Sequence, residues 1–281
     1  GGFQMDYLML SVSILAAVFN SVLLHKEENK TNPFFFNGIC SAVWIVLLLF
    51  MNGFRVHIDK NTLIYGIMYG VVQLLFLFSK LKAMANGPVS VITLIGNCSM
   101  IISAAAGVIF WKESVSIFQI LGMILLLAGI FICSDISKGG AYKPSLKYYA
   151  AGFFCLAGAV GIVFKVFFAA SGGQYCGDML IVAAVFMTVC NLLLSAKHIR
   201  KMSRRELGLS LLCGSASCIY NRLNIYLAGA LPSIIFFPAF NGSVIILSVI
   251  SGVLICGEKL TVKQIIGFCI GAAAIIIIGT T

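Results

Sequence analysis

The chain has 281 residues, of which 60% are hydrophobic and only 10% are charged, and its formal net charge is +10. Soluble domains carry about a quarter charged residues, so this composition excludes an ordinary soluble protein and predicts an integral membrane protein. A membrane-spanning helix needs roughly 20 apolar residues, so ten such helices use most of the chain and leave little for a soluble domain.

We predict ten membrane-spanning helices joined by short loops. In chain order they are Tyr7–Leu24, Pro33–Met51, Leu63–Leu81, Pro88–Trp111, Val115–Ser134, Leu146–Ala170, Gly177–Ala196, Leu207–Ala228, Pro232–Cys256 and Val262–Gly279. The longest loop, 135–144, divides the chain into a first five-helix repeat at residues 5–136 and a second at 145–281. Because five is odd, the two halves insert with opposite orientations. The predicted fold is all-α, with ten transmembrane helices as two inverted five-helix repeats.

The second half repeats polar and glycine positions of the first in the same order. The corresponding pairs are Pro88 and Pro232, Asn97 and Asn241, Ser99 and Ser243, Gly107 and Gly252, Glu113 and Glu258, and Gly122 and Gly267. Six matches in one order, inside two apolar segments that a short acidic turn follows, indicate an internal duplication. Repeats of membrane segments are the common plan of secondary transporters.

Basic residues alternate between the loops and predict the orientation of the chain. Fourteen Lys and Arg follow the odd-numbered predicted helices, whereas Arg55, Lys60 and Lys112 alone lie in the opposite loops. By the positive-inside rule the first set is cytoplasmic, which places both termini on the extracytoplasmic side of a multi-pass protein of the cell membrane. The net positive charge follows from this topology and from attraction to anionic lipids, so no nucleic acid partner is expected.

Two short motifs follow the fourth and ninth predicted helices. One is an acidic turn at Glu113 and Glu258, and the other is Gln-Ile-x-Gly at 119–122 and 264–267. With the ten-helix count, they resemble the EamA-type members of the drug/metabolite transporter superfamily over essentially the whole chain. The resemblance implies a central cavity lined by helices of both halves and secondary transport of a metabolite, but says little about which one. Such relatives are usually described with cytoplasmic termini, the reverse of what the charges predict here.

A polar stripe runs along the predicted helix Leu207–Ala228 at spacings of three and four residues, so it must face other helices instead of lipid. Its members are Ser210, Gly214, Ser217, Asn221, Asn224 and Ala228. We expect the glycine and serine positions to allow close helix packing. Asn221 and Asn224, together with Gln73 in the third predicted helix, are expected to line a substrate cavity.

Asn97 and Asn241 occupy equivalent depths in the fourth and ninth predicted helices. They either line the same cavity or bond to carbonyl groups freed near Pro238, which lies inside the ninth helix and is expected to kink it there.

Two basic residues, Lys165 and Arg222, lie inside predicted helices, where a charge near the bilayer centre costs roughly 2.5 to 3.5 kcal/mol on insertion scales. Either they extend to the lipid headgroups or they face the cavity. Tyr220, Asn221 and Asn224 form a polar cluster around Arg222, which favours the cavity for that residue. No acidic partner is evident in the sequence, so a fixed positive charge predicts a substrate with a carboxylate or phosphate.

The acidic residues all map to predicted loops or helix ends. The small multidrug exporters of the superfamily bind cations through a Glu in their first helix, and the first helix here has no such acid, so that mechanism is disfavoured. A quaternary amine such as choline, or a hydrophobic drug, stays open because cation–π contacts need no acid and the chain has 22 Phe and 9 Tyr. Glu113 and Glu258 are expected to cap short turns and pair with neighbouring lysines.

No nucleotide-binding, hydrolase or metalloprotease motif occurs, and the ten cysteines form no CxxC pair. We therefore expect no enzyme, no cofactor and no metal site. The predicted function is secondary transport, by alternating access, of a small polar metabolite with an anionic group, such as an amino acid or organic acid. The alternatives are transport of a quaternary amine or hydrophobic drug through an aromatic cage and, from another class, a non-transporting membrane scaffold or lipid-handling subunit.

The expected partners are the small-molecule substrate and membrane lipids, and the expected oligomeric state is a monomer or weak dimer. The predicted substrate-binding residues are Arg222, Asn221, Asn224, Tyr220, Lys165, Gln73, Asn97 and Asn241.

Overall fold

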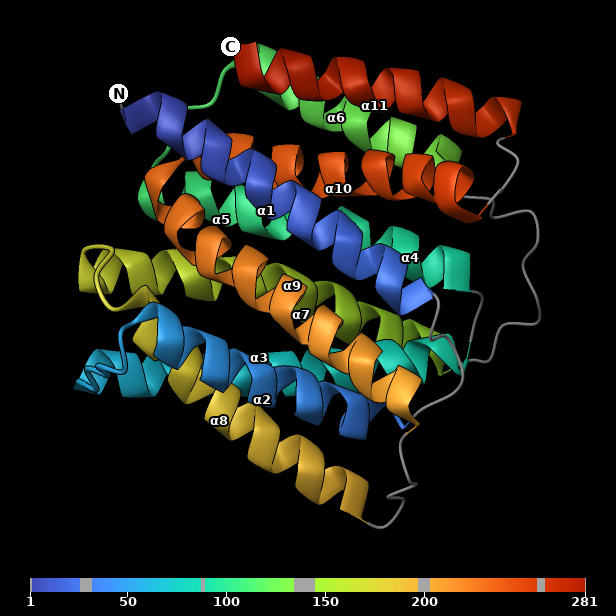
Figure 1. Cartoon of the computed structure of the whole chain (residues 1–281). Coiled ribbons are helices and arrows are strands. Elements are labelled where there is room, and N and C mark those ends of the chain that lie inside the picture. Colours follow the sequence, from blue (N-terminus) through green and yellow to red (C-terminus); the bar gives the residue numbers. More distant parts are fainter. Residues whose placement is uncertain are drawn as a thin grey trace. The chain divides into compact units, whose positions relative to one another are not determined.

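The structure, a computed structural model, describes residues 2–25, 32–86, 89–133, 145–196, 203–256 and 261–280, and these residues form helices and connecting turns (Figure 1). The helices are α1 (Gly2–His25), α2 (Pro33–Met51), α3 (Lys60–Met84), α4 (Val89–Cys98), α5 (Met100–Trp111), α6 (Ile117–Cys133), α7 (Leu146–Ser171), α8 (Cys176–Ser195), α9 (Arg204–Ala230), α10 (Ser233–Cys256) and α11 (Val262–Thr280).

Each predicted helix corresponds to observed helical structure, and Pro33–Met51 has the predicted bounds. The fourth prediction, Pro88–Trp111, differs because the observed helix is interrupted at Ser99. There the backbone N–H and the hydroxyl of Ser99 both donate to the carbonyl of Gly96, at 3.2 and 2.6 Å. A turn with i→i+3 bonds thus separates α4 from α5. Pro238 lies inside α10, and the kink expected there stays a prediction.

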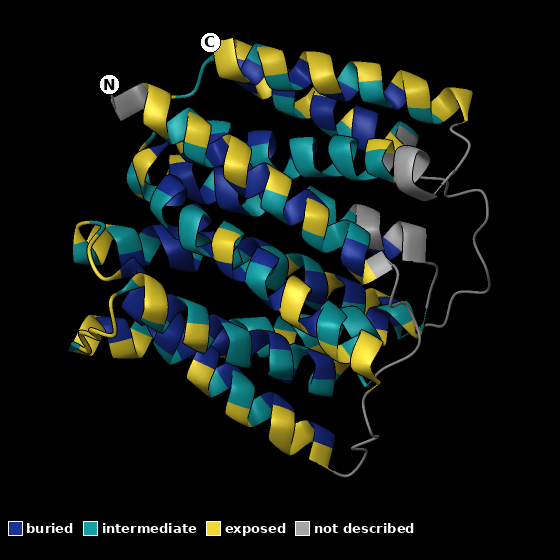
Figure 2. Ribbon diagram, viewed as in Figure 1, coloured by how far each residue is buried: buried dark blue, intermediate teal, exposed yellow. Residues whose placement is uncertain are grey.

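Six helices, namely α1, α2, α3, α7, α8 and α11, are long and apolar enough to cross a membrane. Their outer faces carry large apolar side chains that water would not solvate favourably, such as Leu193 of α8, which is 70% exposed. Figure 2 shows these exposed positions recurring along α8 and α11. The composition and these faces agree with an integral membrane helical protein, while the full number of ten spans stays a prediction.

Short polar segments fix where helices begin. Asp59 accepts a hydrogen bond from the backbone N–H of Thr62 at 2.7 Å and so caps α3. At α6, the side chain of Gln119 accepts from the N–H of Ser116 at 3.1 Å, and at α11 Gln264 accepts in the same way from Thr261 at 2.9 Å. The glutamine of the Gln-Ile-x-Gly motif is therefore a capping residue in both halves.

By their contacts, the helices form two compact units. Unit 1 comprises residues 1–74 and 163–229, and unit 2 comprises residues 75–162 and 230–281. Each unit takes helices from both halves of the sequence, and α3 and α7 each contribute to both units. The two units are defined by contacts between residues, whereas the repeats at 5–136 and 145–281 were predicted from similarity between the two halves of the sequence. The repeat boundaries therefore stay a prediction.

Within unit 1, α2 packs along α8 (Figure 1). Glycines make further close approaches possible. A Cβ at Gly66 of α3 would lie 2.9 Å from the carbonyl oxygen of Met179 in α8, and one at Gly214 of α9 would lie 2.9 Å from that of Cys40 in α2. These small residues serve helix packing, as predicted for the glycines of the polar stripe.

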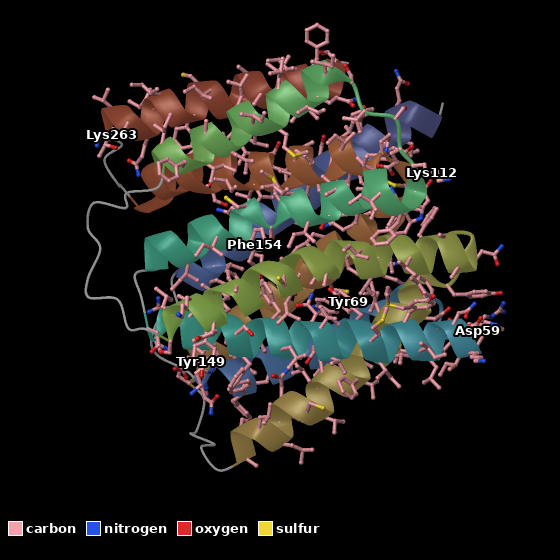
Figure 3. The ribbon with its side chains drawn as sticks, turned by 180° about the vertical axis from the view of Figure 1, so that it is seen from behind. Asp59, Tyr69, Lys112, Tyr149, Phe154 and Lys263 are labelled. Carbon is pink, nitrogen blue, oxygen red and sulfur yellow. The ribbon has the colours of Figure 1, made fainter. Side chains whose placement is uncertain are left out.

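Within unit 2, α6 packs along α11 and α10 packs against α5, α6 and α11. A Cβ at Gly129 of α6 would lie 2.8 Å from the carbonyl oxygen of Gly267, so the two backbones approach closely. Tyr149 and Lys263 lie at one end of this unit and Lys112 at the other (Figure 3). The separation of Lys112 from Lys263 agrees with their predicted placement in loops on opposite sides.

Candidate functional site

Helix α9 positions the candidate site in unit 1. Five of the six predicted stripe residues are buried, namely Ser210, Gly214, Asn221, Asn224 and Ala228. Ser217, the sixth, accepts a hydrogen bond from the indole N–H of Trp44 in α2 at 2.8 Å. The stripe faces other helices, as its spacing predicted, and its serine and glycine members pack or bond against α2.

A hydrogen-bonded network joins α9 to α3. The hydroxyl of Tyr69 donates to Oδ1 of Asn221 at 2.9 Å, and Nε2 of Gln73 donates to the same hydroxyl at 2.6 Å. Nδ2 of Asn221 donates to the backbone carbonyl of Ser217 at 2.8 Å. Tyr69 is 0% exposed and Asn221 is 5% exposed, so the network is buried, and Figure 3 shows Tyr69 midway along α3. Two predicted site residues, Gln73 and Asn221, are thus connected through Tyr69, which was not predicted to belong to the site.

Tyr220 and Asn224 extend the polar surface of α9 towards α1. Oδ1 of Asn224 accepts a short hydrogen bond from the hydroxyl of Ser13, which also lies 3.4 Å from the backbone carbonyl of Tyr220. The side chain of Tyr220 interacts with that of Asn221. Three predicted site residues, Tyr220, Asn221 and Asn224, therefore form one polar surface on α9, and Ser13 of α1 contacts this surface.

Aromatic rings from α7 cover this network. The ring of Phe164 stacks on that of Tyr69 with centroids 4.8 Å apart, and Phe167 meets Tyr65 edge-on at 5.9 Å. Binding sites for small molecules typically combine such apolar walls with a few placed polar groups.

Arg222 follows Asn221 in α9 and is half-buried. It interacts electrostatically with Asp178, which lies in the first turn of α8 and is 6% exposed. Nδ2 of Asn52, just after α2, donates to a carboxylate oxygen of Asp178 at 2.7 Å. The expectation that Arg222 has no acidic partner stays a prediction. Asp178 was correctly placed at a helix end.

Lys165 lies in α7 and is 7% exposed, so in unit 1 it is buried among protein groups, with which it interacts. The burial agrees with the predicted interior position. A role in substrate binding stays a prediction.

Asn97 and Asn241 belong to unit 2. Nδ2 of Asn241 donates to the backbone carbonyl of Phe237, one residue before Pro238, at 2.8 Å. Pro238 frees the carbonyl of Ile234, four residues earlier, so both expected roles of Asn241 stay predictions. Asn97 is the penultimate residue of α4, next to the interruption at Ser99. The helices α10 and α5 are packed together.

Glu113 bonds to the start of another helix. Its carboxylate accepts from the backbone N–H of Ser233 at 2.8 Å and from the Ser233 hydroxyl at 3.3 Å, so it caps the N-terminus of α10 within unit 2. Gly107 makes room for this arrangement, since a Cβ there would lie 2.5 Å from the Glu113 carboxylate. Glu113 thus has a role at α10 that the sequence did not predict, its expected cap and pairing with Lys112 stay predictions, and Glu258 lies outside the described residues.

The sequence did not single out Tyr69, Ser13 or Asn52. Tyr69 lies one turn before Gln73, so the polar face of α3 contained the signal, but a tyrosine in an apolar helix resembles an ordinary core residue. No sequence signal connects Asn52 with Asp178, because their contact depends on how α2 packs along α8.

Comparison with known proteins identifies the family. Residues 4–134 match the EamA-like transporter family. A protein of Staphylococcus aureus (strain MRSA252) described as "Probable glucose uptake protein GlcU" is 25% identical over 285 residues, which cover 97% of each chain, and its counterpart from strain Mu50 / ATCC 700699 gives the same figures. The family match and these relatives support membership of the drug/metabolite transporter superfamily. A solved crystal structure of a protein that covers 96% of this chain and 98% of its own shares the fold, with a TM-score of 0.74 and 12% sequence identity.

The family match and these relatives agree with the resemblance seen in the sequence and support a membrane transporter of this type. The motifs that carry the resemblance have structural roles. The glutamines cap α6 and α11, and Gly122 allows α6 to approach α11, where a Cβ would lie 3.2 Å from the carbonyl oxygen of Ala274.

Proposed function

We propose that this protein is a secondary transporter for a neutral, polyhydroxylated solute, with a hexose such as glucose as the leading candidate. The observation that carries the proposal is the buried network of Tyr69, Gln73 and Asn221. Hydroxyl and amide groups both donate and accept hydrogen bonds, so they match sugar hydroxyls, which also do both. The rings of Phe164 and Tyr69 offer flat apolar surfaces of the kind that sugar C–H groups contact.

The network has a property that suits alternating access. Each donor atom of the triad has a hydrogen-bond partner in this conformation, either within the triad or, for Asn221, at the carbonyl of Ser217. A bound sugar would replace these internal bonds with bonds of similar strength, so the two states would differ little in free energy. The relatives described as glucose uptake proteins support the same class of solute, and the sequence has no ATP-binding motif that would make transport primary.

A metabolite with an anionic group is the second candidate, and half-buried Arg222 favours it. The buried acid Asp178 of the same unit weighs against this candidate, because a carboxylate lowers the positive potential that would attract an anion.

A thermal-shift panel on purified protein tests the proposal. Binding to the folded state raises the free energy of unfolding by about 2.7 kcal/mol at a ligand concentration 100-fold above Kd. D-glucose is expected to raise Tm, whereas D-gluconate, glutamate and choline are expected to leave it unchanged. If only gluconate, glutamate or choline raised Tm, the substrate would belong to the chemical class of that compound and not to the neutral sugars. If no small solute changed Tm, the alternative of a non-transporting scaffold would be favoured.

The variant Gln73→Met keeps the length of the side chain and removes the amide that reaches Tyr69. It is expected to reduce the response to glucose. The matched control is Ser215→Ala on α9, whose hydroxyl bonds to the carbonyl of Leu211 at an exposed position and is expected to leave the response unchanged.

A further inference from the structure

Two lysines meet at the end of unit 2 where α3 finishes and α7 begins. The hydroxyl of Ser145 donates to Oδ1 of Asn86 at 3.1 Å, and Nδ2 of Asn86 donates to the backbone carbonyl of Lys82 at 2.6 Å. Asn86 therefore connects the last turn of α3 to the residue that precedes α7. Lys82 lies in that last turn and Lys147 is the second residue of α7, so both lysines belong to one junction.

Buried apolar side chains hold the same junction together. Ala83 of α3 belongs to one buried cluster with Leu146, Ala150 and Phe153 of α7. The rings of Phe153 and Phe76 follow along the two helices, with their centroids 5.0 Å apart. The backbones that carry Lys82 and Lys147 are thus fixed relative to each other by a core and by hydrogen bonds.

Both ammonium groups lie over aromatic rings. Nζ of Lys82 is 5.6 Å from the centroid of the Phe78 ring, and Nζ of Lys147 is 5.0 Å from that of the Tyr148 ring. These distances are within the range of cation–π contacts. All four side chains are exposed. Exposed aromatic rings with basic groups beside them are typical of the boundary between the membrane core and the lipid headgroups.

The charge at this junction is positive. Within unit 2, the only acid among the residues that the structure describes is Glu113, which bonds to Ser233 and directly follows Lys112. Figure 3 shows Lys112 at the opposite end of the unit from Tyr149, a residue of the junction. The described part of the unit therefore offers the two lysines no acid at their own end.

An apolar surface leads away from Lys82 along α3. Leu75, Phe78 and Lys82 recur at spacings of four and three residues, so they share one face of the helix, and all three are exposed. In a membrane, exposed Leu and Phe side chains contact acyl chains, while a lysine at the helix end reaches the headgroups. A molecule that matches both parts of this surface has an anionic headgroup and acyl chains.

We propose that Lys82 and Lys147 bind the phosphate of an anionic phospholipid at the junction of α3 and α7, with an acyl chain along Leu75 and Phe78. Both lysines belong to the set that the charge pattern predicts to be cytoplasmic, and anionic lipids are concentrated in the cytoplasmic leaflet. The inference concerns a site in unit 2 and does not depend on which solute the protein transports.

Thermal unfolding of the purified protein in a non-ionic detergent tests the ligand class. The three additives are a short-chain phosphatidylglycerol, a phosphatidylcholine with the same chains, and glycerol 3-phosphate. Phosphatidylglycerol is expected to raise Tm in a saturable way, phosphatidylcholine to raise it much less, and glycerol 3-phosphate to leave it unchanged. An equal rise with phosphatidylcholine would overturn the role of charge, and an equal rise with glycerol 3-phosphate would overturn the lipid as the occupant.

Variants test the two lysines. Lys82→Gln and Lys147→Gln are each expected to weaken the apparent affinity for phosphatidylglycerol about fivefold, which corresponds to about 1 kcal/mol for each basic residue near an anionic membrane surface. The double variant is expected to lose about 25-fold. Lys82→Arg keeps the charge and is expected to keep the affinity.

The matched control is Lys112→Gln, which removes one exposed positive charge at the other end of unit 2 and is expected to leave the affinity unchanged. Full affinity in the double variant, or an equal loss in Lys112→Gln, would overturn the inference. The lysines are exposed, so their substitution leaves the buried core intact, and the Tm without lipid verifies that each variant is folded.

Discussion

At the residue scale, the amides and hydroxyls of the candidate site bond to one another and to backbone carbonyls. Tyr69 bonds to Asn221 and Gln73, and Asn224 bonds to Ser13. Burying a polar group without a hydrogen-bond partner costs free energy, so each of these side chains restricts the positions of the residues to which it bonds. The candidate site is therefore a set of mutually dependent residues instead of a collection of independent side chains.

Tyr69→Phe tests this dependence. The substitution removes the hydroxyl shared by Gln73 and Asn221 and leaves two buried amides short of a partner, so the free energy of unfolding is expected to fall by about 1 to 3 kcal/mol. Glucose binding is expected to weaken in the same variant. Thermal unfolding and ligand titration measure the two effects. Tyr65→Phe, one turn earlier and in ring contact with Phe167, is the control, and an equal effect there would contradict the role given to Tyr69.

The sequence predicted which face of a helix is buried more readily than it predicted which residues contact one another. The spacing of polar residues in α9 showed which face is buried, because a helical period of 3.6 fixes the face without any knowledge of neighbours. The bond between Asn52 and Asp178 could not be predicted, because it depends on how different helices pack. The same holds for Glu113, whose partner Ser233 lies on another helix.

At the element scale, close backbone approaches and helix caps hold the bundle together. Most element bounds followed from the sequence because apolar runs end at residues that cap helices, such as Asn32, whose side chain accepts from the N–H of Phe34 at 3.0 Å. The interruption at Ser99 was not predicted, because α4 and α5 form a continuous apolar run in the sequence.

Gly214→Ala is expected to destabilise the protein by about 1 to 3 kcal/mol, because the new Cβ would meet the backbone of Cys40 at 2.9 Å and neither backbone can yield cheaply. Gly208→Ala, on the same helix, has nothing within 4 Å and is expected to be neutral or to stabilise by roughly 0.5 to 1 kcal/mol. Thermal unfolding of the two variants provides the comparison. Equal Tm values would mean that α9 does not approach α2 as closely as described.

Glu113→Gln tests the cap on α10. The neutral amide keeps an acceptor for Ser233 but loses the charge that favours the helix N-terminus, so a loss of roughly 0.3 to 1 kcal/mol is expected. Glu206→Gln is the matched control because glutamine replaces glutamate well in the capping box with Ser203. A Tm drop of the same size in both variants would argue against the specific role of Glu113.

At the scale of the whole molecule, the proposed topology depends on charge. Fourteen basic residues in one set of loops against three in the other predict that both termini are extracytoplasmic. Reporter fusions at either end are expected to read as extracytoplasmic. Neutralising the five basic residues in the segment 197–205 is expected to mix the orientations, and a cytoplasmic reading at the C-terminus of the unaltered protein would contradict the prediction.

The most direct test of the central claim is entrance counterflow in proteoliposomes made from the purified protein. Vesicles loaded with unlabelled D-glucose are diluted into labelled D-glucose without ATP, and a secondary transporter exchanges the two. The account predicts a transient accumulation of label that excess D-glucose abolishes, that D-glucuronate leaves intact, and that Tyr69→Phe reduces. Absence of glucose counterflow, in vesicles where a labelled carboxylate or choline does exchange, would contradict it.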